Sequence, residues 1–457
     1  MFERLISVVR DSILGSRASD ASDDRKDSPA PGCKLPAAPS AMPAGDDANT
    51  GFLCRELVVG RDQRVAGHHF MLRESTRNRI RTGERRIHHV YTEILVREIA
   101  RANIGPLLGH RAAFLDIPDS FIGHPSLLDL PAAHTALLLT RIEAEGTPDN
   151  DTLLEAVRRL RSAGFRIGIA ADDLLGDRAA LLPETDFFTL QAATSDPAHL
   201  RDLVSRLRIA GGHGLLLVRD LPSADDFQLC LALGAALFEG PFITRREDWN
   251  GKRLGPNSAR LSALIARLRS DADTGELVDL LKQDPALSLR LMRYINSPGV
   301  GLQREVASIE AALLQLGRER LYRWLLLLLY GADKGSPRSS AALENALVRA
   351  RLMELLGEGR SAREADSLYL TGLLSLVDVI LEVPLHEAMR SLGVTPDIEQ
   401  AVVRGTGPLA GFLRLAIACE NGDEEGVQEA AARCGIAPAD ANRHHLQAFS
   451  WALEING

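Results

Sequence analysis

The sequence predicts two fold classes in one chain, an α/β part followed by an all-helical part. Between Phe52 and Phe242, short apolar runs alternate with amphipathic helical patterns, which is typical of a parallel sheet covered by helices. That many units permit a (β/α) barrel. From Arg260 onward, apolar residues recur only at helical spacing, with Gly and Pro between the segments. We therefore expect a barrel that is followed by a helical domain.

Three segments are expected along the chain. Residues 1–50 form a short amphipathic helix and a linker, residues 51–250 the barrel, and residues 251–457 the helical domain with its C-terminal helices. The first helix is either a frayed helix or a docking element for a partner or a membrane surface. The linker, from Gly15 to Asn49, is rich in Ser, Asp, Ala, Pro and Gly, so we expect it to be disordered.

The α/β part is read from apolar runs bounded by turn residues. The predicted strands are residues 53–59, 65–72, 112–117, 136–142, 166–170, 187–190, 214–218 and 236–238. The predicted helices between them are residues 91–103, 152–163, 198–209 and 223–233.

The stretch from Gln283 to Tyr330 is the expected core of the helical part. Ser308 is expected to cap its second helix. The third helix ends in an apolar run from Trp324 to Tyr330, which is far shorter than the ~20 residues of a membrane span, so we expect it to be buried. Further helices are predicted at residues 260–269, 276–283, 341–356, 365–380, 385–392, 396–404, 409–420, 424–434 and 439–454.

Composition excludes several classes of protein. The 457 residues are 45% hydrophobic with a net charge of −8, which argues against general nucleic-acid binding. The five cysteines are scattered without a CxxC pair, so neither a zinc site nor a disulfide framework is indicated. A cytoplasmic protein without a transmembrane segment is expected.

The segments DPALSLRLMRYINSP, SIEAALLQLG and RLYRWLLLLL resemble the HDOD domain, from about Leu261 to the C-terminus. The resemblance implies a helical relative of the HD metal-dependent phosphohydrolases that is not known to be catalytic. We interpret its motif residues as helix caps, stops and packing residues of an interaction module; they are Asp284, Pro285, Asn296, Ser297, Gly317 and Trp324.

The segment EADSLYLTGLLSLVDVI resembles the helix that carries the His-Asp dyad of active HD hydrolases. Ser375 and Leu376 stand at the dyad positions, and neither side chain can replace an imidazole or a carboxylate on a metal. Asp378 remains, and we interpret it as a surface or capping acid.

The segments VAGHHFMLR, AGFRIGIA, TDFFTLQ and LFEGPFITR resemble the EAL domain, a (β/α) barrel that hydrolyses cyclic di-GMP with two metal ions. On that resemblance, most metal-site positions carry other residues. The family's Glu falls at His69, its Asn at Asp116, a second Glu at Leu138, its Lys at Thr189 and its Gln at Glu239. Its Asp pair falls at Ala170 and Ala171, its later Asp at Gln191, and its late Glu at Val218 or Leu221.

Three features stay open. A loop shift could restore the acid pair through Asp172 and Asp173, although turn or cap carboxylates are the alternative. The pairs His68-His69 and His88-His89 could offer metal ligands, but neighbours on a strand face opposite sides, so each pair offers one ligand at most. The basic block Arg77–Arg86 is either a phosphate or nucleic-acid site or a solvated loop.

We therefore predict a signalling protein that is not an enzyme, holds no cofactor or catalytic metal, and regulates other signalling proteins by binding them. Alternatives are an inactive protein that binds cyclic di-GMP as an effector, and an active metal-dependent cyclic di-GMP phosphodiesterase. Nucleic acid is disfavoured as a partner, and a homo-oligomer is an open option.

Overall fold

The computed structural model describes residues 53–72, 85–142, 147–192, 197–270, 272–297, 306–332 and 337–456. The helix and linker expected in residues 1–50, and most of the basic block Arg77–Arg86, lie outside the described residues.

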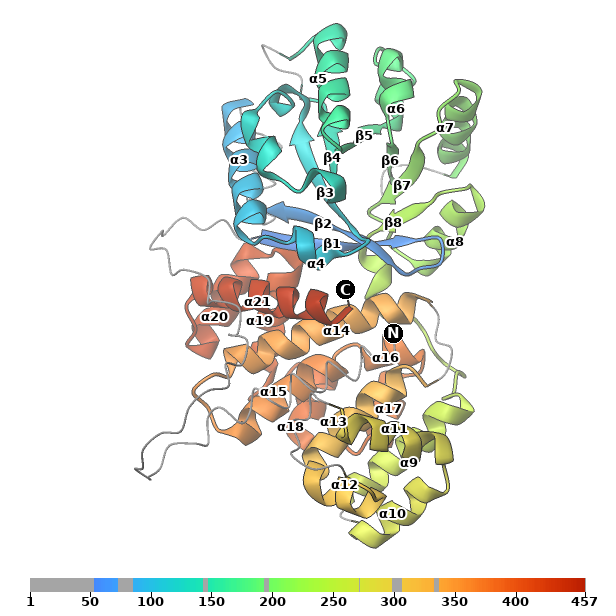
Figure 1. Cartoon of the computed structure of the whole chain (residues 1–457), viewed down its shortest axis with the longest axis vertical. Coiled ribbons are helices and arrows are strands. Elements are labelled where there is room, and N and C mark those ends of the chain that lie inside the picture. The colour runs from blue at the N-terminus through green and yellow to red at the C-terminus, as the bar shows by residue number, and fades with distance from the viewer. Residues whose placement is uncertain are drawn as a thin grey trace.

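The first part is a closed barrel in which the strands follow one another in sequence order (Figure 1). β1 runs antiparallel to both of its neighbours, and the other strands are parallel. The strands are β1 (Leu53–Gly60), β2 (Val65–Leu72), β3 (Ala112–Pro118), β4 (Thr135–Thr140), β5 (Arg166–Ala170), β6 (Phe187–Gln191), β7 (Leu215–Arg219) and β8 (Leu237–Glu239). The expected barrel class is confirmed, and the carboxyl ends of β2 to β8 open at one end of it, the barrel mouth.

Helices on the outside bury the other face of each strand. They are α3 (Arg85–Arg101), α4 (Gly105–Leu108), α5 (Asn150–Ser162), α6 (Ala171–Leu174), α7 (Pro197–Ile209) and α8 (Ala224–Ala232), with short turns η1 (Asp119–Phe121), η2 (Pro125–Asp129), η3 (Ala132–His134), η4 (Ala179–Glu184) and η6 (Pro241–Ile243). α3 begins six residues before the predicted Tyr91, because His88 and Thr92 are buried while Arg86 stays exposed. Part of the expected basic loop is therefore helical.

The barrel interior is filled by one apolar layer. Phe114 and Phe187 meet edge to face there, with ring centroids 5.4 Å apart. The remaining buried members are Val58, Ala112, Ala136, Leu138, Leu217 and Leu237. This layer closes the barrel below its mouth, so the interior is a packed core and only the mouth can hold polar chemistry.

The second part consists of helices packed around one large core (Figure 1). They are α9 (Pro256–Arg269), α10 (Thr274–Lys282), α11 (Pro285–Ile295), α12 (Ile309–Leu316), α13 (Arg318–Tyr330), α14 (Pro337–Leu356), α15 (Ala362–Leu374), α16 (Val377–Leu381), α17 (Leu385–Ser391), α18 (Pro396–Glu399), the π-helical turn η8 (Gln400–Arg404), α19 (Ala410–Asn421), α20 (Glu424–Cys434) and α21 (Pro438–Asn456). The all-helical class is confirmed.

α13 is the centre of this core. Every residue from Leu321 to Tyr330 is buried, and Trp324 stacks on Tyr294 at 5.8 Å between ring centroids. The prediction that this apolar run is buried is therefore confirmed. In the described parts of the chain, no helix is long and apolar enough to cross a membrane.

The helix predicted over residues 365–380 is in fact two helices. α15 ends at Leu374, and α16 starts at Val377. The Ser375 Oγ donates to the Gly372 carbonyl at 2.7 Å, and Leu376 leaves the helical region with φ −122°. A hydroxyl that bonds its own helix backbone competes with helix continuation, and the sequence pattern did not show this.

The helical part covers the outer face of β1 and β2. Figure 1 shows α14, α19 and α21 directly below these two strands. Phe449 on α21 contacts His68 and Phe70 of β2, with ring centroids 5.2 and 5.8 Å away. Phe449, Leu453 and Ala341 belong to the same apolar cluster as the barrel strands, so the two parts share a core.

Candidate functional site

Four charged side chains meet at the barrel mouth. They come from four different strands: His69 from β2, Asp116 from β3, Arg219 from the last position of β7 and Glu239 from the last position of β8. His69 and Glu239 are 0% and 1% exposed, and the side chains of Arg219 and Asp116 are 13% and 38% exposed. We call these four residues the mouth cluster.

Arg219 binds both acids of the mouth cluster. Its Nη1 and Nη2 lie 2.9 and 3.0 Å from the two Asp116 oxygens, which is a bidentate ion pair. Its Nε lies 3.5 Å from Glu239 Oε2. The guanidinium therefore sits between the two carboxylates.

His69 bridges the same two acids. Its Nδ1 lies 2.8 Å from Glu239 Oε1, and its Nε2 lies 3.2 Å from Asp116 Oδ2. Burial opposes a charged imidazole, but Glu239 and then Asp116 outweigh it and raise the pKa of His69 to about 9, although Arg219 acts against this. At neutral pH His69 is an imidazolium that donates to both acids.

The two acids are held ionised by these cations. Burial acts to raise the pKa of Glu239, but His69 and Arg219 lower it to about 2. Burial likewise opposes ionisation of Asp116, yet Arg219 and His69 hold its pKa well below the ordinary range. Glu56 on β1 also hydrogen bonds to Glu239. The mouth cluster therefore carries two negative and two positive charges.

A second set of charges lies on the rim of the mouth, where the chain leaves β3, β4 and β5. Asp119 is fully buried and pairs with Arg178 at 2.5 Å. Asp173 lies 3.8 Å from Arg178 and 3.9 Å from Arg141, and burial raises its pKa although these two arginines oppose it. Asp172 points away, with its side chain 68% exposed. Of the two open acids, only Asp173 faces the rim, and it does so beside arginines.

The remaining EAL-like positions bring no carboxylate to the mouth. Leu138 belongs to the apolar layer inside the barrel, and Thr189 lies on β6 beside Ala170 of β5. Ala171 is buried against the outer helices. That these positions correspond to EAL ligands stays a prediction.

The two histidines of β2 face opposite sides, as expected for strand neighbours. His69 lies in the mouth cluster, whereas His68 lies on the outer face against Phe449. His89 on α3 lies 2.8 Å from Ser120 Oγ, away from both. In the described ranges, no group of three or more His, Cys, Asp or Glu is arranged to hold a metal ion.

The metal pair that the EAL resemblance implies does not fit the mouth cluster as it stands. A Mg²⁺ ion needs about six oxygen ligands in a near-octahedral shell. Here Arg219 takes both oxygens of Asp116, and both ring nitrogens of His69 face carboxylates. The oxygens and nitrogens that a metal ion would use as ligands therefore already have partners within the cluster.

The HD-dyad positions lie where the barrel connects to the helices. Ser375 Oγ lies 3.2 Å from Arg349 Nη1, and its carbonyl accepts from Arg246 at 3.2 Å. Asp378, 2% exposed, pairs with Arg246 Nε at 3.2 Å. Burial raises the pKa of Asp378, and Arg246 opposes that rise. Asp378 is thus a buried acid that docks the connecting segment, so the surface interpretation is wrong. The capping alternative is supported, because its carboxylate accepts backbone hydrogen bonds in the first turn of α16.

Glu344 on α14 is the centre of the contact between the two parts. It lies 3.1 Å from Arg111 Nη1, 3.6 Å from His68 Nε2 and 4.0 Å from Arg55 Nη1. All four residues are buried, and Arg55 also lies over the Phe449 ring at 4.4 Å. Burial, then Arg55 and Arg111, hold the pKa of His68 well below its ordinary value, so this histidine is neutral. We call these four residues the Glu344 interface.

The HDOD motif residues serve the helices, as predicted from their types. Asp284 accepts from the Leu287 N–H at 2.9 Å with Pro285 in the first turn. Asn296 ends α11 and pairs its side chain with both backbone groups of Val306, at 2.7 and 2.8 Å. Ser297 Oγ donates to the Tyr294 carbonyl at 2.7 Å, and Gly317 separates α12 from α13 with φ 72°.

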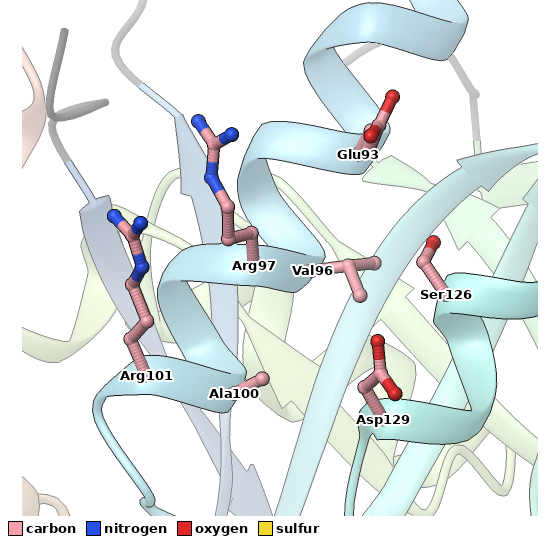
Figure 2. A pocket seen from close by; sticks show the side chains of 7 residues that line it. All are labelled: Glu93, Val96, Arg97, Ala100, Arg101, Ser126 and Asp129. Atoms are coloured by element: carbon pink, nitrogen blue, oxygen red, sulfur yellow. The ribbon is translucent and has the colours of Figure 1, made fainter.

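Two hollows lie outside the barrel, along α3. Figure 2 shows the first, of about 370 Å³, with Val96 and Ala100 facing Ser126 and Asp129 across it. The second, of about 340 Å³, is lined by Arg85, Arg86 and His89 among others. Neither contains a residue of the mouth cluster, so the described end of the basic block lies on the barrel flank.

Sequence reasoning missed Arg219. It named His69, Asp116 and Glu239 only as separate losses, because each was compared with a family position. Arg219 is 103 residues from Asp116 and 150 from His69 in the chain. An arginine as the last residue of an apolar strand, LLLVR, was the available signal.

Comparisons with known proteins agree on the two parts. Residues 258–393 match the HDOD domain. Cyclic di-GMP phosphodiesterase CdgJ of Vibrio cholerae is 21% identical over 419 residues, which cover 91% of this chain and 95% of that protein. The uncharacterized protein YuxH of Bacillus subtilis is 20% identical over 88% of this chain and 98% of that protein. The chain is thus related to proteins of cyclic di-GMP signalling.

Among solved structures, an EAL domain protein from Listeria monocytogenes matches 43% of this chain and 88% of that chain at 12% identity, with a TM-score of 0.33. The PaMucR phosphodiesterase in complex with c-di-GMP matches 42% of this chain and 96% of that chain at 17% identity, with a TM-score of 0.33. The barrel itself is identified by its own strand order.

One prediction from the sequence needs correction. The chain was predicted not to be an enzyme, yet a relative that matches nearly its whole length is named a cyclic di-GMP phosphodiesterase. The prediction failed because it inferred loss of activity from single replaced positions. Three of the replaced positions instead carry ionisable groups that converge at the mouth.

Proposed function

We propose that this chain, a β/α barrel followed by an HDOD domain, is a cytoplasmic cyclic di-GMP signalling protein: the barrel mouth binds the dinucleotide, and the helical part passes the bound state to another signalling protein. The observation that carries the proposal is the placement of β2. Its neighbouring residues His69 and His68 belong to the mouth cluster and to the Glu344 interface.

The mouth offers groups that suit a phosphodiester. Arg141 of the rim keeps its side chain 34% exposed, whereas both Nη atoms of Arg219 already bind Asp116. Arginine recognises phosphate oxygens through two parallel N–H donors. The partner of Arg141, Asp177, is 60% exposed, so a phosphate can compete with this surface pair at little cost.

The helical part offers a surface for a protein partner. Leu289 on α11 and Leu314 on α12 are 53% and 72% exposed on two helices that contact each other. Exposed apolar side chains on neighbouring elements favour a protein contact over a small polar ligand.

The test is a calorimetric titration of the whole chain with cyclic di-GMP, with and without Mn²⁺, in which the same samples are analysed for hydrolysis products. We expect a saturable complex of micromolar or tighter affinity, which Arg141→Ala weakens about tenfold. Arg158→Ala, which removes another arginine on the barrel outside the mouth, is the matched control. No heat at high ligand concentration would reject the proposal.

A second candidate is hydrolysis of the dinucleotide, because the relative CdgJ is named a phosphodiesterase. The linear product in the samples above would establish it. Asp116→Asn should then abolish turnover if the mouth cluster is the site, and unchanged turnover would place the chemistry elsewhere.

Hydrogen exchange tests whether ligand binding at the barrel mouth changes the structure of the helical part. Binding at the mouth should alter amide protection not only in β2 and β3 but also in α14 around Glu344. A change confined to the barrel mouth would contradict signal transfer while leaving ligand binding intact.

A further inference from the structure

The mouth cluster places two cations where the EAL resemblance implies metal. We propose that His69 and Arg219 together take the place of a divalent metal ion between Asp116 and Glu239, so that the mouth of this barrel is electrically balanced without metal. The proposal concerns the protein without ligand and holds whether or not a dinucleotide binds.

Geometry supports the replacement first. A metal ion joins acids from different strands by binding one oxygen of each. Here the acids are joined by hydrogen bonds and ion pairs instead. His69 lies 2.8 Å from Glu239 and 3.2 Å from Asp116, and Arg219 lies 2.9 Å from Asp116 and 3.5 Å from Glu239. The carboxyl ends of β2, β3, β7 and β8 are thereby tied together.

Charge supports it second. A divalent ion brings two positive charges, and an imidazolium with a guanidinium brings the same two. Burying an unpaired carboxylate lowers the stability of a fold. Asp116 and Glu239 would therefore destabilise the barrel if neither a metal ion nor a cationic side chain were beside them. A metal ion could bind the two acids only by displacing Arg219 from them. It would then also be repelled by the positive imidazolium of His69.

The rim repeats the pattern. Asp119 pairs with Arg178, and Asp173 lies between Arg178 and Arg141. At two neighbouring places, the acids at the carboxyl ends of the strands face arginines from other elements. The acids of the mouth and of the rim are thus neutralised in the same way, by cationic side chains from other elements.

The experiment uses Mn²⁺ as the probe and electron paramagnetic resonance of the free ion as the measure of binding. The wild-type chain, Asp116→Asn, Arg219→Ala and the double variant are titrated. We expect Asp116→Asn to leave Mn²⁺ binding of the wild-type chain unchanged. Arg219→Ala should bind Mn²⁺ at least tenfold more tightly than the wild type, and the double variant should lose this gain.

Arg206→Ala is the matched control, because Arg206 lies on the surface of α7, where it pairs with Asp202 at 3.5 Å. It should not change Mn²⁺ affinity. Thermal unfolding gives a second readout, since Mn²⁺ should raise the melting temperature of Arg219→Ala and not that of the wild type.

Two results would overturn the proposal. One is a wild-type Mn²⁺ site that Asp116→Asn or Glu239→Gln removes. The other is a folded Arg219→Ala protein that gains no site. If Arg219→Ala does not fold, Arg219→Gln is used in its place. The comparison of Mn²⁺ binding by the wild type and by Asp116→Asn tests the proposal without either variant.

Discussion

His69 determines how the barrel responds to pH. Its pKa is raised to about 9 by groups on other strands, namely Glu239 on β8 and Asp116 on β3, against Arg219 on β7. A group whose pKa is raised by folding stabilises the fold below its unfolded pKa of about 6.5 and loses that contribution as pH rises through 9. We predict that the free energy of unfolding falls by up to about 3 kcal/mol across this window.

Urea unfolding at several pH values measures this dependence. His69→Gln should flatten it, because a glutamine amide does not titrate. The exposed His110→Gln is the control and should keep the wild-type slope. Equal slopes in wild type and His69→Gln would contradict the assignment of the charge to His69.

At this scale the sequence predicted that several positions depart from the EAL pattern, and those assignments stay predictions. Leu138 was assigned to a lost ligand position because apolar residues bind no metal. The proximity of His69 to Arg219 could not be predicted, since it arises only when β2 and β7 are brought to one mouth by barrel closure. The sequence shows which ionisable side chains are present, but the closure of the barrel determines which of them lie close together.

Helix α11 depends on the N-cap residue that precedes it, Asp284. Asp284 caps it by accepting from the Leu287 N–H at 2.9 Å. Asp284→Ala should lower the free energy of unfolding by about 1 kcal/mol, because one buried helix-end donor loses its acceptor. Asp284→Ser, which can also cap, should lose much less. A similar loss for Ala and Ser would show that the carboxylate has a role beyond capping.

Elements with local signals were predicted closely. The strands 65–72 and 166–170 and the helix 424–434 have the predicted bounds, since turn residues and caps mark their ends. The start of α3 and the break after Leu374 were missed. The first depends on a tertiary contact, the burial of His88, and the second on a local bond from the Ser375 hydroxyl to the Gly372 carbonyl, which the apolar pattern does not show.

The Glu344 interface joins the two parts of the molecule. Glu344 is the acid closest to Arg55, Arg111 and His68 there. Glu344→Gln would leave buried arginines without this charge, and breaking a buried pair in this way costs about 3 kcal/mol or more. Glu429→Gln, which breaks the exposed pair with Arg433, should cost under about 0.5 kcal/mol.

Chemical unfolding of the two variants and the wild type provides the comparison. Equal, small losses for Glu344→Gln and Glu429→Gln would show that solvent reaches the interface. The sequence predicted both parts of the molecule but not this interface, because Arg55, His68 and Arg111 have no pattern that distinguishes them from surface charges.

The shared core has a consequence for synthesis on the ribosome. β1 and β2 are among the first elements made, but Phe449, which packs on His68 and Phe70, comes about 200 residues after the last barrel strand. At roughly 5–20 residues per second, that delay is on the order of 10–40 s. The nascent barrel therefore exposes the outer face of β2 around Phe70 to solvent until α21 has left the ribosome.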